Sequence, residues 1–205
     1  MTHRTKHPKH ERTLVVIKPD GIQRSLIGEI IKRYERIGLK LVGVKMLVPS
    51  AEFVEKHYTL DPEWRMKTGL KTLKGYADKG LKPPIDDPLE ITRILLKRLS
   101  DYLTKGPVIA MVWQGAHAVE IVRKVTGGTE PLASADIGTI RGDFALDSYQ
   151  MSDGDSRSVR NLVHASGSAK EAEDEIAHWF SEAELFDYHL LVEQMIYGPS
   201  LDGIL

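Results

Sequence analysis

Residues 13–18 read TLVVIK, and the turn-forming run Pro19-Asp20-Gly21 follows directly. The apolar stretch predicts a buried strand that ends at the turn. Apolar residues then recur at helical spacing until Gly38, which favours the end of a helix, and Leu39–Val48 alternates as a second strand. The positions with helical spacing are Ile27, Ile30, Ile31 and Tyr34.

The same order of elements returns in the second half of the chain. Val108–Trp113 predicts a third strand, Ala116–Val125 a helix closed by Gly127-Gly128, and Arg160–His164 a short fourth strand. Ser168-Ala169-Lys170-Glu171 has the spacing of a capping box and opens another helix. Two β-α-β units predict an α+β fold of the ferredoxin-like, split βαβ type, with a four-stranded antiparallel sheet and helices packed on one face.

Two stretches exceed this minimal plan. Residues 71–100 predict a helical insertion, whose second half begins with Asp87 as N-cap and Pro88 at the first helical position. Residues 145–158 (ALDSYQMSDGDSRS) are polar and predict an enlarged surface loop. Residues 1–10 are expected to form a flexible basic tail, and residues 11–205 a single domain that contains both insertions.

The composition excludes several classes of protein. A net charge of −1 over 205 residues argues against dedicated nucleic-acid binding, which needs a basic surplus. The chain has no cysteine, which rules out disulfides and thiolate chemistry and is typical of the cytoplasm. It also lacks an apolar run long enough to span a membrane.

His164 stands where a nucleophile for phosphate would stand. It follows the apolar residues of a strand, and small residues follow it before a helix begins. The free amides and the positive dipole end of a helix favour a phosphate nearby. Glu175, two turns into that helix, can accept a hydrogen bond from one imidazole nitrogen and leave the other free to attack. Judged by itself, a histidine at a strand end is more often structural.

Candidate phosphate ligands are Lys18 after the first strand, Arg123 on the second main helix, Thr129 after the double glycine, and Arg141. Each of the cations taken singly would more often be a solvated surface residue. The sequence has neither a G-x-x-x-x-G-K-[ST] loop nor the glycine loop of protein kinases. A nucleotide enzyme built from this chain would therefore hold phosphates with side chains.

Taken together, several segments resemble the nucleoside diphosphate kinase family. The histidine lies in an N-x-x-H-[GA]-S pattern, and the other matching segments precede it in the family's order. These segments are residues 11–43 (containing IKPDG), 106–115 (GPVIAMVWQG) and 138–144 (GTIRGDF), followed by 161–166 and Glu175. The resemblance implies ping-pong transfer of a terminal phosphate from a nucleoside triphosphate to a nucleoside diphosphate through phosphohistidine, which maintains nucleotide pools.

The resemblance also implies a role for each matching residue. His164 would carry the phosphate, Glu175 would orient it, and Ser166 would bond to Glu175. The positions that match phosphate and ribose ligands are Lys18, Tyr58, Arg123, Thr129, Arg141 and Asn161. Mg²⁺ would arrive on the nucleotide without a protein cage of its own, and the chain would form a homo-oligomer.

The sequence departs from the family pattern in three places. Gly167 stands where an aspartate is common, and residues 145–158 enlarge a loop close to the expected nucleotide. The insertion at 71–100 shifts the register of the aromatic that stacks on the base, and leaves Trp64 and Met66 as candidates.

Three other functions stay open at this point. A ferredoxin-like RNA-binding module needs exposed aromatics on its central strands, where this chain has aliphatic residues. A catalytically idle relative would have lost the histidine or the arginines, and both are present. Transfer of the phosphate to another protein is a third alternative.

Overall fold

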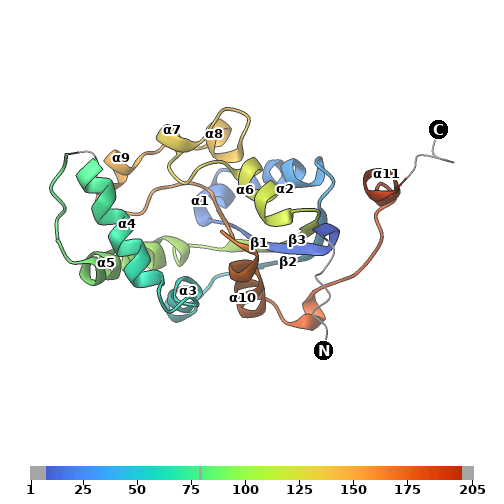
Figure 1. Cartoon of the computed structure of the whole chain (residues 1–205), viewed down its shortest axis with the longest axis horizontal. Coiled ribbons are helices and arrows are strands. Elements are labelled where there is room, and N and C mark those ends of the chain that lie inside the picture. Colours follow the sequence, from blue (N-terminus) through green and yellow to red (C-terminus); the bar gives the residue numbers. More distant parts are fainter. Residues whose placement is uncertain (1–7, 79, 200–205) are drawn as a thin grey trace.

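A computed structural model describes residues 8–78 and 80–199, and residues 1–7 of the expected basic tail lie outside the described part. Its centre is a four-stranded antiparallel sheet in the order β2-β3-β1-β4 (Figure 1), which confirms the predicted fold class. Three strands lie where the sequence predicted them, and the fourth is shorter. The strands are β1 (Glu11–Ile17), β2 (Lys40–Leu47), β3 (Val108–Gly115) and β4 (Val163–Ala165).

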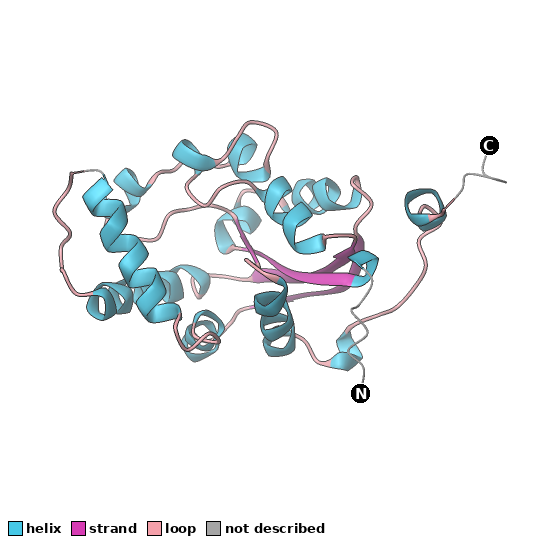
Figure 2. Ribbon diagram, viewed as in Figure 1, coloured by secondary structure: helices cyan, strands magenta, loops and turns pink. Residues whose placement is uncertain are grey.

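Helices cover both faces of the sheet (Figure 2), so the expectation of a single covered face was wrong. The reason lies in β1, where Val15 and Ile17 enter one apolar cluster while Leu14 and Val16 enter another on the opposite face. A central strand that is apolar on both sides must be covered on both sides. The main helices are α2 (Ile27–Glu35) and α6 (Ala118–Thr126) above the sheet in Figure 1, and α3 (Ala51–Tyr58) and α10 (Ala169–Trp179) below it.

The predicted helix starts are found at two caps. The Ser168 hydroxyl accepts a hydrogen bond from the Glu171 amide, and α10 begins at the next residue. The Asp87 carboxylate accepts from the amides of Leu89 and Glu90 at the start of α5 (Pro88–Leu103). Both helix starts therefore follow from local side-chain chemistry.

The stretch predicted as a helical insertion lies in a hairpin of α4 (Trp64–Asp78) and α5, on the left in Figure 1. The two helices meet closely at Gly69, where a Cβ atom would lie 2.0 Å from the Pro88 carbonyl oxygen. The Thr92 hydroxyl also donates to the Arg65 carbonyl at 2.7 Å. A glycine is required at this contact because any side chain would separate the helices.

The enlarged loop at 145–158 carries a short helix, α9 (Tyr149–Gly154), that its polar composition did not predict. Asp147 and Ser148 of this loop are buried, and the Asp147 carboxylate accepts hydrogen bonds from Arg157 and from the amides of Ser148 and Arg160. Polar residues can therefore anchor this loop without an apolar core.

Shorter elements complete the chain, and its C-terminal part runs along β2. The Phe186 amide donates to the Val42 carbonyl at 2.7 Å, and the buried Lys40 ammonium pairs with Glu193 at 3.0 Å. In the described part of the chain, no helix is long and apolar enough to cross a membrane. The shorter elements are η1 (Pro8–His10), α1 (Pro19–Gln23), α7 (Pro131–Ser134), α8 (Ile140–Phe144), η2 (Glu182–Glu184) and α11 (Glu193–Tyr197).

Candidate active site

His164 lies in β4, opposite Val16 of β1, at the edge of the sheet. The preceding backbone is strained, because Leu162 has a φ of +67°, a conformation that branched side chains rarely adopt. Two hydrogen bonds hold it there. The Leu162 amide donates to the Asp20 carboxylate at 3.2 Å, and its carbonyl accepts from the Lys18 amide at 2.8 Å. The turn after β1 therefore fixes the backbone just before the histidine.

One side of the His164 ring faces a buried carboxylate. Its Nε2 lies 2.8 Å from Oε1 of Glu175, and the Ser166 hydroxyl donates to Oε2 of Glu175 at 2.5 Å. The Leu14 amide donates in turn to Ser166 Oγ at 3.2 Å. Because a carboxylate only accepts, Nε2 carries the hydrogen and Nδ1 keeps a free lone pair. The structure thus brings together the three residues that the sequence predicted as catalytic.

Most of the other charges near the ring are positive, and the Glu171 carboxylate is the exception. Burial, and next the charge of Lys18, lower the pKa of the His164 imidazole, and Arg141 and Arg123 contribute in the same direction. Burial, followed by repulsion from Arg141, also lowers the pKa of the Lys18 ammonium to about 7. The histidine is therefore neutral at neutral pH, as attack through a lone pair requires.

Asn161 connects the lysine to the segment after the double glycine. The Lys18 ammonium donates to its Oδ1 at 2.7 Å, and its Nδ2 donates to the Thr129 carbonyl at 2.8 Å. A lysine can only donate and a carbonyl can only accept, so both contacts fix the same orientation of the amide. Three residues predicted as nucleotide ligands are thereby held in one hydrogen-bonded chain.

The two predicted arginines differ in their surroundings. Arg141 is 8% exposed, and its three nitrogens donate to the carbonyls of Asn161, Gly127 and Val163 at 3.1, 2.9 and 2.5 Å. Two of its five N–H groups remain for a ligand. Arg123 is exposed and borders a hollow of about 350 Å³. The other residues lining that hollow are Lys124, Gly127, Gly128, Asp136 and Thr139.

Tyr58 closes another side of the site. The centroid of its ring lies 6.3 Å from that of His164 and 5.6 Å from that of Trp64. Met66, the other candidate for base stacking, is exposed farther along α4. Tyr58, at the end of α3, therefore lies between His164 and Trp64, the first residue of α4.

The departure at Gly167 has a structural counterpart. A Cβ atom at this glycine would lie 2.6 Å from Oε2 of Glu171, one turn into α10, and 3.8 Å from the nearer guanidinium nitrogen of Arg123. A carboxylate thus occupies the space that a side chain at residue 167 would need. The acidic group nearest to residue 167 is the Glu171 carboxylate.

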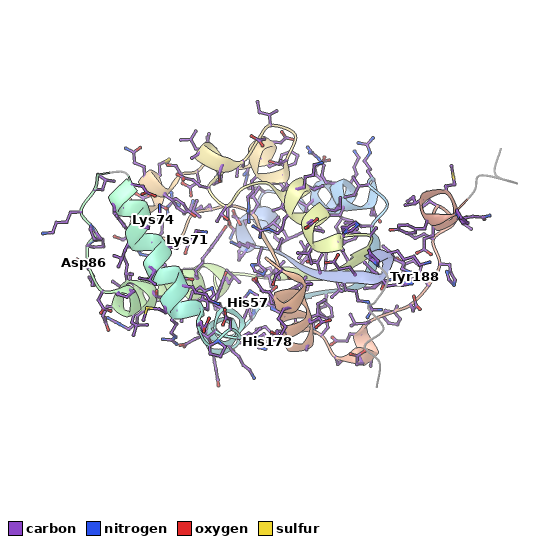
Figure 3. All side chains as sticks on the ribbon, viewed as in Figure 1. His57, Lys71, Lys74, Asp86, His178 and Tyr188 are labelled. Carbon is purple, nitrogen blue, oxygen red and sulfur yellow. The ribbon has the colours of Figure 1, made fainter. Side chains whose placement is uncertain are left out.

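Sequence reasoning missed His57 and Trp179, which lie behind the carboxylate. The His57 ring is buried, 4.6 Å from that of His164 between centroids, and its Nδ1 accepts a hydrogen bond from the Trp179 indole at 3.1 Å. In Figure 3 the labelled His57 lies near His178, where α3 and α10 meet below the sheet. The available signal was helical spacing, because His57 shares the buried face of α3 with Val54.

The ligand atoms of His57, His164 and Glu175 all lie within 4.8 Å of one another, as the donors of a metal site would. However, Nδ1 of His57 already accepts from Trp179, and Nε2 of His164 is bonded to Glu175. A metal ion bound through these two nitrogens would have to displace both hydrogen bonds. The geometry favours a hydrogen-bonded network at this place.

Comparisons with known proteins identify the family of this chain. The family model described as nucleoside diphosphate kinase matches residues 11–73 and 91–185. A nucleoside diphosphate kinase of Pyrobaculum aerophilum is 47% identical over 181 residues, which are 86% of this chain and 98% of the relative. One from Pyrococcus abyssi is 44% identical over 178 residues, 87% of this chain and 89% of the relative.

Solved structures give the same result. The crystal structure of the Pyrobaculum aerophilum NDP kinase superposes with a TM-score of 0.82 at 45% identity, and the match covers 87% of this chain and 100% of that one. The Borrelia burgdorferi enzyme, solved as a transition-state mimic with vanadate and ADP, has a TM-score of 0.74 at 32% identity, over 90% and 95% of the two chains. The chain therefore belongs to the nucleoside diphosphate kinase family and is a phosphotransferase acting on nucleotides.

Proposed function

We propose that His164 is the group that carries the phosphate between nucleotides. The observation behind this proposal is the hydrogen bond from His164 Nε2 to Glu175, which leaves the Nδ1 lone pair free in a positively charged surrounding. Glu175 would orient the ring and stabilise the positive charge that develops on it during transfer. Ser166 would hold Glu175 through their hydrogen bond of 2.5 Å.

The proposed reaction has two mirrored steps. The Nδ1 lone pair of His164 attacks the terminal phosphorus of a nucleoside triphosphate, and the bond to the bridging oxygen breaks with its electron pair leaving on the diphosphate. A second nucleoside diphosphate then attacks the phosphohistidine, and the nitrogen recovers its lone pair. Both steps are ping-pong chemistry through a covalent intermediate.

The cations would bind and stabilise the phosphates in these steps. Lys18 and Arg123 would act as charges on the phosphate chain, and Arg141 would offer its two remaining N–H groups. Asn161, Thr129 and Tyr58 would contact the nucleotide beside them, and Trp64 is the better placed of the two candidates for base stacking.

We also propose that Mg²⁺ is carried by the nucleotide. Lys18, Arg123 and Arg141 contribute positive charge around His164, and the neighbouring Glu175 carboxylate is already bonded to the ring, which fits a metal ion bound mainly by phosphate oxygens. Mg²⁺ usually keeps several waters, and the Glu171 carboxylate beside Gly167 would face them. When bound, the ion would neutralise phosphate charge, while the residues named here hold the phosphorus in line with the ring.

A homo-oligomer is supported by the edge of the sheet. Val44, Met46 and Val48 alternate along β2 and just after it, and each is more than half exposed. An apolar row on an edge strand suits burial against a second copy. The cytoplasmic location expected from the absence of cysteine stays a proposal.

The test is phosphorylation of the purified protein. Incubation with γ-labelled ATP and Mg²⁺ should give acid-labile, base-stable label, and His164→Gln should abolish both the label and nucleotide exchange. Exposed His189 offers a matched control, because His189→Gln should leave the label unchanged. Near-normal exchange in folded His164→Gln would overturn the proposal.

A further inference from the structure

His57 carries a buried polar atom that the proposed reaction does not use. Its Nε2 has no hydrogen-bond partner among the described residues, although the side chain is almost fully buried. Buried polar groups are nearly always paired, so each exception calls for an explanation. The lack of a partner at Nε2 follows from the hydrogen bond that Nδ1 of the same ring accepts.

The tautomer of His57 follows from its partner. The Trp179 indole nitrogen can only donate, so Nδ1 of His57 must accept at their distance of 3.1 Å. Burial is also the main cause that lowers the pKa of His57 to about 3, so the ring is neutral. The single ring hydrogen is therefore on Nε2, the atom that has no partner.

The alternative tautomer would disturb the active site. Nδ1 of His57 lies 3.6 Å from Oε1 of Glu175, the same oxygen that accepts from His164 at 2.8 Å. With a hydrogen on Nδ1, a small movement of the His57 ring would let it donate to that oxygen. His57 would then compete with His164 for the charge of Glu175, and this competition would weaken the hydrogen bond that orients the proposed nucleophile.

We propose that Trp179 and His57 form a tautomer lock that reserves Oε1 of Glu175 for His164. The indole hydrogen bond keeps Nδ1 of His57 unprotonated, so the edge of the ring nearest to Glu175 presents a lone pair and no donor. Both are positioning residues, because they act through Glu175 and not on the phosphate. This inference rests on the proposed role of His164 as the nucleophile.

Charged and titratable neighbours are consistent with a neutral His57. The groups that influence it are His164, Glu175, His178 and Lys18, and of these only Glu175 favours its protonation. Burial outweighs that attraction. The lock therefore determines which nitrogen of His57 carries the hydrogen, and the ring is neutral in either tautomer.

The chain offers a matched pair of variants for the test. Trp179→Phe removes the indole donor and keeps an aromatic ring at the site. Trp113→Phe makes the same change at another buried tryptophan, whose indole nitrogen has no partner among the described residues. Comparing the two separates the lost hydrogen bond from the lost packing volume.

The first measurement is the single-turnover rate of His164 phosphorylation with saturating Mg-ATP. We expect Trp179→Phe to lower this rate about tenfold, as when a charge-assisted hydrogen bond becomes shared, and Trp113→Phe to leave it unchanged. The double variant Trp179→Phe/His57→Phe removes the competing donor, so its rate should recover above that of Trp179→Phe.

The second measurement observes the tautomer directly, without catalysis. Two-bond ¹H–¹⁵N spectra of the ¹⁵N-histidine-labelled protein should show His57 protonated only at Nε2, and Trp179→Phe should move hydrogen onto Nδ1. A protonated Nδ1 in the unaltered protein would overturn the lock, even where Trp179→Phe fails to fold. An unchanged rate in folded Trp179→Phe, or no recovery in the double variant, would overturn it as well. Failure of the proposed function is distinct, because it appears as label retained in His164→Gln.

Discussion

The two sides of the His164 ring differ in charge: one side faces a hydrogen-bonded carboxylate, and the other faces buried cations. On the carboxylate side, the Leu14 amide donates to Ser166, and Ser166 and His164 both donate to the Glu175 carboxylate. On the cation side, Lys18 and Arg141 are buried near each other, and burial lowers the pKa of both. The first side is complete in the protein alone, whereas the second keeps positive charge that an anion would neutralise.

The difference between the two sides indicates that the buried cations contribute the free energy of phosphate binding. Desolvated like charges destabilise the free protein, and a bound phosphate relieves both the desolvation and the repulsion. The completed side has the separate task of holding the ring in one orientation. Substitutions on the two sides should therefore change stability, kcat and KM to different extents.

The largest effect is expected at Arg141, which belongs to both the binding site and the fold. Arg141→Ala would leave the carbonyls of Gly127, Asn161 and Val163 without their donor, and should cost about 2–4 kcal/mol of unfolding free energy. It should also lower kcat/KM by roughly one to three orders of magnitude. Chemical denaturation and steady-state kinetics measure the two losses.

Arg123→Ala is the matched comparison, because Arg123 is exposed. A similar loss of kcat/KM is expected, with the unfolding free energy changed by less than about 0.5 kcal/mol. Equal destabilisation by both substitutions would remove the distinction between the two arginines. Unchanged kinetics in both would show that neither contacts phosphate.

A smaller effect is expected at Glu175, on the complete side. In Glu175→Gln, the amide oxygen can still accept from His164, and the amide nitrogen can donate to Ser166, whose hydroxyl can turn toward the Leu14 carbonyl 3.5 Å away. The charge is lost but the hydrogen bonds remain, so kcat should fall roughly 10- to 100-fold with KM little changed. Complete loss of labelling in the folded variant would give Glu175 a more direct role than orientation.

The pH dependence of nucleotide binding tests the charge held on the open side. Lys18 has a pKa lowered to about 7, so its positive charge is present below that pH and is lost as the pH rises through it. KM should therefore increase by several-fold between pH 7.5 and 9, a range in which nucleotide phosphates are already ionised. Lys18→Gln should start from a higher KM that does not vary across this range. A flat KM in the unaltered protein would mean either that Lys18 keeps its charge throughout this range without nucleotide, or that its charge does not contribute to binding.

The residues that the sequence assigned to the complete side lie together in the structure because they are close in the chain. His164, Ser166 and Glu175 lie within twelve positions, and a strand followed by a capped helix is enough to bring them together. The family pattern also selected Lys18 and Asn161, which are 143 residues apart and share a hydrogen bond. The periodicity of apolar residues does not predict that Lys18 and Asn161 are in contact.

What the sequence did not predict depends on tertiary contacts. His57 and Trp179 are 122 positions apart, and their hydrogen bond exists only because α3 and α10 pack on the same face of the sheet. The strained φ of Leu162 shortened the predicted fourth strand, and no local residue preference indicates it. The covering of both faces of the sheet likewise became clear only from the structure, in which the two faces of β1 pack into separate apolar clusters.

The smallest effect is expected where the two segments predicted as insertions meet, outside both sides of the ring. Asp153 of α9 accepts from Tyr76 of α4 at 3.2 Å and from Arg98 of α5 at 3.3 Å, and all three side chains are partly exposed. Exposed pairs of this kind contribute about 0–1 kcal/mol, so Asp153→Asn should change kcat/KM less than about threefold.

Asp155→Asn is the control, because Asp155 pairs with Arg157 inside the same loop at 2.9 Å. If the loop merely borders the site, the two variants should have the same KM for nucleotides within error. A KM that rises only in Asp153→Asn would show that the contact between loop and hairpin shapes the nucleotide site. Nucleotide binding would then depend on this contact between loop and hairpin as well as on the carboxylate and cation sides of His164.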